Sequence, residues 1–213
     1  MINLKYFLKG IGCAKKIDSP AIALGLSFIA IGALLRNLGF TIQESIFSTF
    51  LTYALPGSLV MAESMLIGVS LLNIFLAVWL VNSRLYPMTV SLMPLLMDKN
   101  QPRWKYYLSC HFIAVSSWLI MKDNYENIEK ENRIDFWIGI GTATWSVAIF
   151  STVIGYVASD FLNKDILIGL AIINPIYFIC MMIGAMKTFQ ISLSVILGTI
   201  LGPAFYFFCT NNA

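Results

Sequence analysis

Residues 55–94 read LPGSLVMAESMLIGVSLLNIFLAVWLVNSRLYPMTVSLMP, a nearly unbroken apolar run of about forty residues. About twenty apolar residues suffice to cross a bilayer, so this run predicts membrane-spanning helices. Two charged residues, Glu63 and Arg84, lie inside it. An arginine at mid-membrane costs roughly 2.5–3.5 kcal/mol on insertion scales. We therefore expect Arg84 to have a functional role.

The composition of the whole chain agrees with a membrane protein. Of the 213 residues 58% are hydrophobic and 12% charged, about half the charge of a typical soluble domain. No basic patch with interleaved aromatic residues occurs, which excludes nucleic acid as a partner. Four scattered cysteines and one histidine make a metal site improbable. The sequence has no H-E-x-x-H, no G-x-S-x-G and no phosphate-binding glycine loop, so we expect neither an enzyme nor a cofactor.

The hydrophobic segments predict an all-α, polytopic transmembrane helical bundle. We expect about seven spans, at residues 20–35, 45–69, 71–97, 106–121, 136–158, 166–186 and 191–209. Together they form a single transmembrane domain over residues 20–209, followed by a C-terminal stub at 210–213. Thr41 and Glu44 fit a capping box before the second span. The polar stretch 122–135 is predicted to be a solvated loop.

The first nineteen residues differ from the rest in carrying four lysines between short apolar stretches. Leu4, Phe7, Leu8 and Ile11 recur at helical spacing, which predicts a basic amphipathic helix on the cytoplasmic membrane surface. A solvated tail is the alternative. The lysines favour a cytoplasmic N-terminus.

Several predicted spans are interrupted. Pro56-Gly57 breaks the second span, residues 82–87 break the third, and Asn174-Pro175 breaks the sixth. Broken spans in both halves of a chain are typical of transporters built from inverted repeats, so an inverted repeat is possible here. Two unrelated proline kinks are the alternative. The segment around Pro56-Gly57 could also re-enter the membrane, but we favour seven full spans.

The breaks supply the candidate binding site. A helix that restarts at Pro56-Gly57 presents the Gly57 and Ser58 amides and a positive dipole end, which suit a carboxylate. Arg84 offers a planar fork of donors for the same anion, and Asn82 can orient it. In the alternatives, neighbouring helices satisfy the kink, and Arg84 either pairs with Glu63 or snorkels to the interface. Glu63 is thus a candidate for ion pairing or for coupling.

LPGSLVMAE, followed about twenty residues later by LVNSRLYPMTVSLMP, resembles the AzlC family of branched-chain amino acid exporters. Gly57 and Ser58 fit the family's A-G-(A/S)-A-Q helix break, with Val60 in place of glutamine. Asn82, Arg84 and Pro94 fit its N-x-R-H element, with Leu85 in place of histidine.

The similarity extends over about residues 10–208. Ser116-Ser117 stands where the family usually carries an Asp-Glu pair, and Trp145 and Gly155 fit a W-x-x-x-T/G-x-x-x-G helix.

The resemblance implies a secondary transporter that exports branched-chain or similar apolar amino acids across the bacterial inner membrane as a multi-pass protein. It also implies a small AzlD-type membrane subunit as a partner, beside the amino-acid substrate and the lipid bilayer. Two alternatives stay open: a transporter or channel for another small solute, and a non-transporting membrane subunit whose role is assembly.

Overall fold

The computed structural model describes residues 2–16 and 19–161, and beyond them residues 169, 172, 176, 179, 193 and 196–201. The chain divides into two compact units, residues 1–173 and 174–213. In the second unit, residues 196–201 are helical. The predicted spans 166–186 and 191–209 lie largely outside the described residues, and so does the Asn174-Pro175 break. The account below therefore concerns the first unit.

Every regular element in the described part of this unit is a helix, as the sequence predicts. The α-helices are α1 (Leu4–Ala14), α2 (Pro20–Asn37), α3 (Ile42–Leu51), α4 (Leu55–Leu66), α5 (Leu71–Asn82), α6 (Leu85–Leu96), α7 (Arg103–Ser109), α8 (Val115–Asn124) and α9 (Arg133–Ala158). Three short 3-10 turns, η1 (Cys110–Phe112), η2 (Tyr125–Asn127) and η3 (Lys130–Asn132), connect the later helices.

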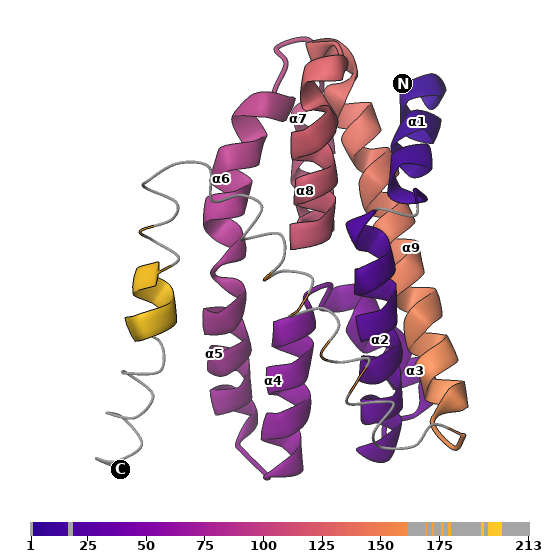
Figure 1. Cartoon of the computed structure of the whole chain (residues 1–213), viewed down its shortest axis with the longest axis vertical. Coiled ribbons are helices and arrows are strands. Elements are labelled where there is room, and N and C mark those ends of the chain that lie inside the picture. The colour runs from indigo at the N-terminus through magenta and orange to yellow at the C-terminus, as the bar shows by residue number, and fades with distance from the viewer. Residues whose placement is uncertain are drawn as a thin grey trace. The chain divides into compact units, whose positions relative to one another are not determined.

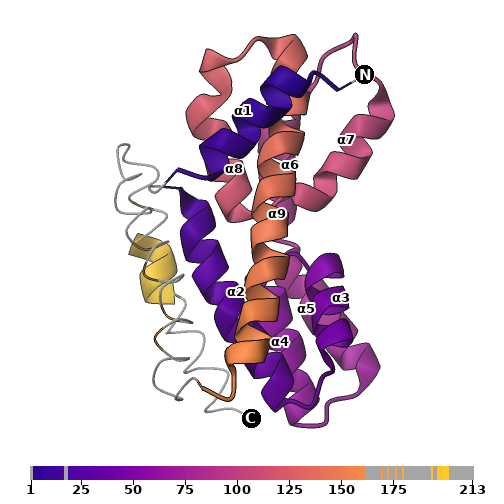
Figure 2. The same cartoon turned by 90° about the vertical axis from the view of Figure 1, so that its right-hand side faces the viewer.

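Helix α9 contacts most of the other described helices, whereas α4 and α5 pack on each other (Figure 1). At 26 residues it is the longest described helix, and α1 and α2 follow one another along it (Figure 2). Glycines bring the backbones into direct contact: a Cβ atom on Gly139 would collide with the Phe7 carbonyl, and one on Gly155 with the Ile29 carbonyl. Close approach of this kind is how helices pack in membranes, where small residues replace the hydrophobic driving force.

Local sequence signals explain where the early helices begin. Ser19 caps α2 by accepting the Ala21 N–H, and Pro20 occupies the first helical position, where its missing N–H is no loss. The predicted capping box of α3 is confirmed: the Thr41 N–H donates to Glu44 Oε2 at 2.8 Å, and the Glu44 N–H donates to Thr41 Oγ1 at 3.3 Å.

The predicted second span, residues 45–69, is not one helix. Helix α3 ascends to the middle of α9, the chain turns at residues 52–54, and α4 descends again (Figure 2). The two helices have 10 and 12 residues, about 15 and 18 Å, against a hydrocarbon core of about 30 Å. They therefore form a half-length hairpin, as in the re-entrant alternative, and not the full span that the sequence analysis favours.

The predicted fourth span, residues 106–121, is a second half-length hairpin that enters from the opposite end. Helix α7 and η1 run to the middle of α9, the chain turns at Ile113 and Ala114, and α8 runs back. The predicted loop 122–135 is more structured than expected, because α8 extends into it, and Ile134 and Asp135 are buried in the first turn of α9.

The third predicted span has the predicted interruption. Helices α5 and α6 meet at Ser83 and Arg84 with a bend of 44°. By length and composition, α2 and the segment 130–158 can each cross a membrane, and the bent α5–α6 pair would be a third span. The seven-span count is thus not confirmed for the described part of the chain.

Because each hairpin returns to the end from which it enters, the polar loops on either side of the second hairpin lie at the same end of the unit. The Asn3 N–H donates to Asp135 Oδ2 at 2.8 Å, and Gln101 Nε2 donates to the Glu131 carbonyl at 3.0 Å. The N-terminus, the 98–102 loop and the 125–133 segment therefore share one end of the unit, which we call the basic end. It carries Lys5, Lys99, Arg103, Lys105, Lys122, Lys130 and Arg133. In the described chain, the opposite end has Arg36.

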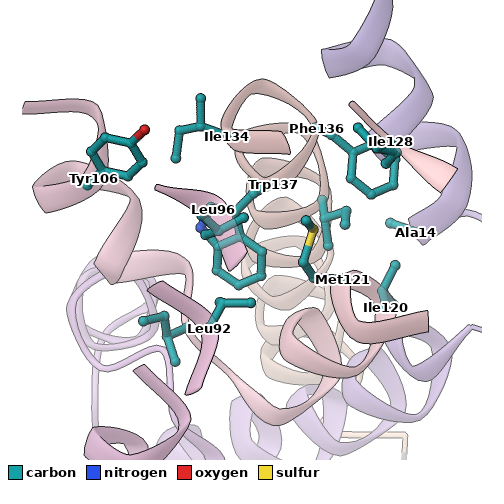
Figure 3. Close-up of a cluster of buried hydrophobic side chains, with 12 residues drawn as sticks. Ala14, Leu92, Leu96, Tyr106, Ile120, Met121, Ile128, Ile134, Phe136 and Trp137 are labelled. Atoms are coloured by element: carbon teal, nitrogen blue, oxygen red, sulfur yellow. The ribbon is translucent and has the colours of Figure 1, made fainter. Parts of the chain in front are cut away.

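Large apolar side chains fill the core near the basic end (Figure 3). Trp137 of α9 and Met121 of α8 are fully buried there beside Leu92 of α6. Trp137 Nε1 also donates to the Ser109 carbonyl at 3.2 Å, which ties α7 to α9.

A buried ion pair also connects α7 to α9. Lys105 Nζ lies 2.9 Å from Asp135 Oδ1, and both side chains are 2% exposed. Lys105 also donates to Gln101 Oε1 at 2.9 Å. Removing one partner of such a pair leaves an uncompensated buried charge, so the pair holds the second hairpin in its position on α9.

The arrangement of the loops gives a topology test. In a chain of seven full spans, the loops around Asn100 and Asn127 lie on opposite sides of the membrane, whereas here they share the basic end. We expect Asn100→Cys and Asn127→Cys, each in a background without the native cysteines, to react with a membrane-impermeant maleimide from the same side. Labelling from opposite sides would restore the seven-span topology.

Helix α1 offers a matched test of the backbone contact with α9. A Cβ atom on Gly10 would collide with the Phe136 carbonyl, while one on Gly12 meets nothing within 4 Å. Gly12→Ala should raise stability by up to about 1 kcal/mol through helix propensity. Gly10→Ala should lower the thermal unfolding temperature in detergent because α1 must move away. Equal effects of the two variants would contradict this packing.

Candidate functional site

Three interruptions of helical structure lie at about the level of the middle of α9 (Figure 1). They are the turn of the α3–α4 hairpin at residues 52–54, the turn of the α7–α8 hairpin at Ile113 and Ala114, and the α5–α6 bend at Ser83 and Arg84. Helix interruptions expose backbone groups without helical partners. At membrane depth such groups are tolerated only where protein or a water-filled cavity surrounds them.

Aromatic side chains join the two hairpin turns. Trp145, midway along α9, has ring centroids 4.7 Å from Phe50 and 6.0 Å from His111, and its Nε1 donates to the Phe50 carbonyl at 3.4 Å. Tyr53 lies 6.5 Å from His111. The tips of the two hairpins, which enter from opposite ends, therefore meet at Trp145.

The α3–α4 turn also contacts the α5–α6 bend. A Cβ atom built on Gly57 would lie 2.6 Å from Asn82 Nδ2 and 2.7 Å from Asn82 Oδ1. The Asn82 side chain thus lies directly on the Gly57 backbone, and a larger residue at position 57 would displace the Asn82 amide. The structure thereby brings together two of the residues that the sequence nominates, which are 25 positions apart.

The role predicted for Ser58 needs correction. Its N–H is not available, because it donates to the Ala54 carbonyl at 3.0 Å, and its hydroxyl donates to the Thr52 and Ala54 carbonyls at 3.3 and 3.2 Å. Pro56 does not kink a span either, since it lies in the first turn of α4, where proline is favoured. Ser58 therefore closes the turn, and the Gly57 N–H is the amide nearer to Asn82.

Arg84 and Glu63 do not form the ion pair that the sequence allowed. Neither residue has a salt bridge among the described residues, and both are exposed. The antiparallel register explains this: Gly57 faces Asn82, so Glu63, six residues further along α4, lies roughly 10 Å from the level of Arg84. Arg84 precedes α6, two positions after Asn82.

Buried polar atoms without hydrogen-bond partners cluster at these interruptions. In the described part of the chain they are Ser48 Oγ, Tyr53 OH, Asn82 Oδ1 and Ser116 Oγ. Tyr53 is 5% and Ser116 2% exposed. Leaving such groups unsatisfied costs about 1–3 kcal/mol each, and few occur in a native structure. A ligand with donors and acceptors of its own would satisfy them.

Ser116 and Ser117 take different parts in the second hairpin. The Ser117 hydroxyl accepts the Ala114 N–H at 3.0 Å and donates to the Phe112 carbonyl at 2.6 Å, so it closes the turn before α8. Ser116, one position earlier, keeps its hydroxyl free. Each hairpin therefore has one hydroxyl that closes the turn, Ser58 or Ser117, and one buried hydroxyl without a hydrogen bond, Tyr53 or Ser116.

Tyr53 and His111 are the residues that sequence reasoning missed. The sequence gives no signal for His111 at a turn, because no glycine or proline marks the turn at Ile113. Tyr53 lies two positions before Leu-Pro-Gly, and a polar aromatic residue beside a helix start was the available signal. Among the described residues no group of His, Cys, Asp and Glu is placed to hold a metal ion.

Comparison with known proteins gives one match. The family model described as AzlC protein matches residues 19–162, which include every described helix of the first unit except α1. No curated protein and no solved structure matches the chain.

The hydroxyl of Tyr53 meets the geometric criteria for no hydrogen bond, although Thr144 is its neighbour, and it gives a test with a matched control. Tyr53→Phe should leave the thermal unfolding temperature unchanged or raise it, because it removes a buried group that has no hydrogen bond. Tyr106 is equally buried, but its hydroxyl accepts the Asp98 N–H at 2.9 Å. Tyr106→Phe should therefore cost about 0.5–1.5 kcal/mol. A destabilised Tyr53→Phe protein would show that its hydroxyl is satisfied.

Proposed function

The chain belongs to the AzlC family, a transporter family associated with amino acids, and from this premise we propose that it exports branched-chain or similar apolar amino acids. Transport is secondary, across the bacterial inner membrane, and needs no catalytic residue or cofactor. The observation that carries the proposal is the contact between Gly57 and Asn82, close in sequence to Tyr53 and Arg84. The buried Tyr53 hydroxyl and Asn82 Oδ1 there have no hydrogen-bond partner.

The groups at this point match the two ends of an amino acid. The Gly57 N–H at the start of α4 and the guanidinium of Arg84 hold the carboxylate, as helix N-termini and arginine do elsewhere. The Asn82 Oδ1 and Tyr53 hydroxyl oxygens accept hydrogen bonds from the ammonium group. The apolar side chain lies among the aromatic and aliphatic residues around Trp145.

Alternating access follows from the two hairpins. Each hairpin leads from one end of the unit to the middle of α9. Movement of one tip away from Trp145 opens the site to that end, while the other tip keeps the site closed. Transporters commonly use half-helices in this way, with the substrate near the bilayer midplane.

The distribution of charge supports an orientation. Lysine and arginine accumulate on the cytoplasmic side of membrane proteins, and the basic end carries most of the described ones. We therefore assign the N-terminus, the 98–102 loop and the 125–133 segment to the cytoplasm. The proposed partner is a small AzlD-type membrane subunit, as for the family that the sequence resembles.

A different small solute is the second candidate, either carried by a transporter or passed by a channel. It is favoured by the departures from the family pattern at Val60, Leu85 and Ser116-Ser117, which lie at or near the three interruptions. Saturable and stereoselective flux would exclude a channel. A non-transporting assembly subunit, the third candidate, would bind its partner stably and give no flux in any combination.

Removal of the Arg84 guanidinium tests the exporter directly. Cells that produce this chain together with a candidate small partner are loaded with Val-, Leu- or Met-containing dipeptides, and amino-acid efflux is measured. The native chain should accelerate efflux. Arg84→Ala should reduce the gain at least about tenfold, because loss of a charged hydrogen bond costs about 1.5–3 kcal/mol.

The control is Lys9→Ala, which removes an exposed positive charge from α1, far from the interruptions along the chain. It should transport like the native protein, with both variants present in the membrane at equal amounts. Full efflux by Arg84→Ala would remove this residue from the site. Absence of efflux by the native chain with its partner would favour the second candidate.

A further inference from the structure

An open groove lies between the end of α6 and the start of α7, away from the hairpin tips. Its volume is about 1080 Å³. Met93, Pro94 and Met97 of α6 and the following loop form one wall, and Tyr107 and Cys110 form part of the other. Helix α7, which carries part of the second wall, has only 7 residues.

The mouth of the groove is basic. Lys99, Arg103 and Lys130 line it together with one carboxylate, Asp98, so the charged lining carries a net charge of three minus one, or +2. Asp98 is already engaged, since its Oδ1 accepts the Asn100 N–H at 3.0 Å. No salt bridge in the described part of the chain involves the three cations.

Of the other cations of the basic end, Lys5 is exposed on α1 and does not line the groove, whereas the remaining three have partners. Lys105 is paired with buried Asp135. Arg133 donates to the Leu95 and Ile128 carbonyls and lies 5.2 Å from the centroid of the Tyr125 ring. Lys122 lies 5.5 Å from the centroid of the Trp118 ring. The cations that line the groove therefore differ from their neighbours in being exposed and available to an external anion.

We propose that this groove binds an anionic phospholipid, with the phosphate at Lys99, Arg103 and Lys130 and an acyl chain along Met93, Met97 and Tyr107. The charge selects an anionic headgroup, and the apolar walls continue from the polar loop toward α7 and suit a hydrocarbon chain. Basic pockets between helices at the cytoplasmic side are typical sites for such lipids. A free anion would use the cations but not the walls.

The test uses the purified full-length chain in a neutral detergent. Phosphatidylglycerol and phosphatidylcholine with identical acyl chains are titrated separately, and bound lipid is counted by native mass spectrometry. We expect saturable binding of phosphatidylglycerol in preference to phosphatidylcholine. Arg103→Gln/Lys130→Gln should weaken it roughly thirtyfold, given the contribution of each basic residue near anionic lipid.

The matched control is Lys5→Gln/Lys9→Gln, which removes the same charge from exposed positions on α1. It should change the affinity less than about twofold if the site is local, because screened surface charges act weakly at a distance. An equal loss of phosphatidylglycerol affinity in the two double variants would mean that the lipid is attracted by the overall surface charge, and it would overturn the proposed site.

Two further outcomes are decisive. Excess inorganic phosphate should leave the lipid bound, because phosphate alone lacks the acyl-chain contact. Complete displacement by phosphate would assign the cations to a small anion and overturn the lipid site. Equal binding of the two lipids would overturn it as well. Circular dichroism of both double variants confirms that the fold is retained.

Discussion

The structure depends on how closely other helices can approach α9. Gly139 and Gly155 let the backbones of α1 and α2 touch α9 directly, and Gly141 admits the Phe112 ring at the second hairpin tip in the same way. Van der Waals contact is the main cohesive force between helices in lipid, and it requires such small residues. With α1 and α2 fixed along its length, α9 can serve as the support for helices that do not cross the membrane themselves.

Half-length hairpins have a cost that full spans avoid. Each turn interrupts the helical hydrogen bonds in the apolar interior, and serines repair part of the loss: Ser58 bonds to the Thr52 and Ala54 carbonyls, and Ser117 bonds to Ala114 and Phe112. The side-chain oxygens of Tyr53, Asn82 and Ser116 are left without a hydrogen-bond partner. Apolar groups at these positions would avoid the cost of burying unsatisfied polar atoms. In the function proposed above, a polar ligand satisfies them.

Much of this arrangement could be predicted from the sequence, wherever a local signal exists. Ser19-Pro20 and Thr41–Glu44 begin helices as predicted, and the bend after Asn82 occurs within the predicted interruption.

The turns of the two half-length hairpins were harder to predict, because an apolar segment of about twenty-five residues has the same composition whether it crosses the membrane or turns halfway. Pro56-Gly57 did indicate a break, but proline starts α4, and the turn precedes it. The turn at Ile113 has no glycine or proline. The contact of Gly57 with Asn82 was expected only in outline, since register depends on packing.

The buried pair of Lys105 and Asp135 has a consequence for how the protein is made. The two residues are 30 positions apart, and at about 5–20 residues per second the ribosome needs roughly 1.5 to 6 seconds to reach the second after the first. During that interval the lysine has no carboxylate to neutralise it. Until Asp135 has been synthesised, water or lipid headgroups must solvate the Lys105 ammonium, so the buried join between α7 and α9 can form only after the chain has reached the start of α9.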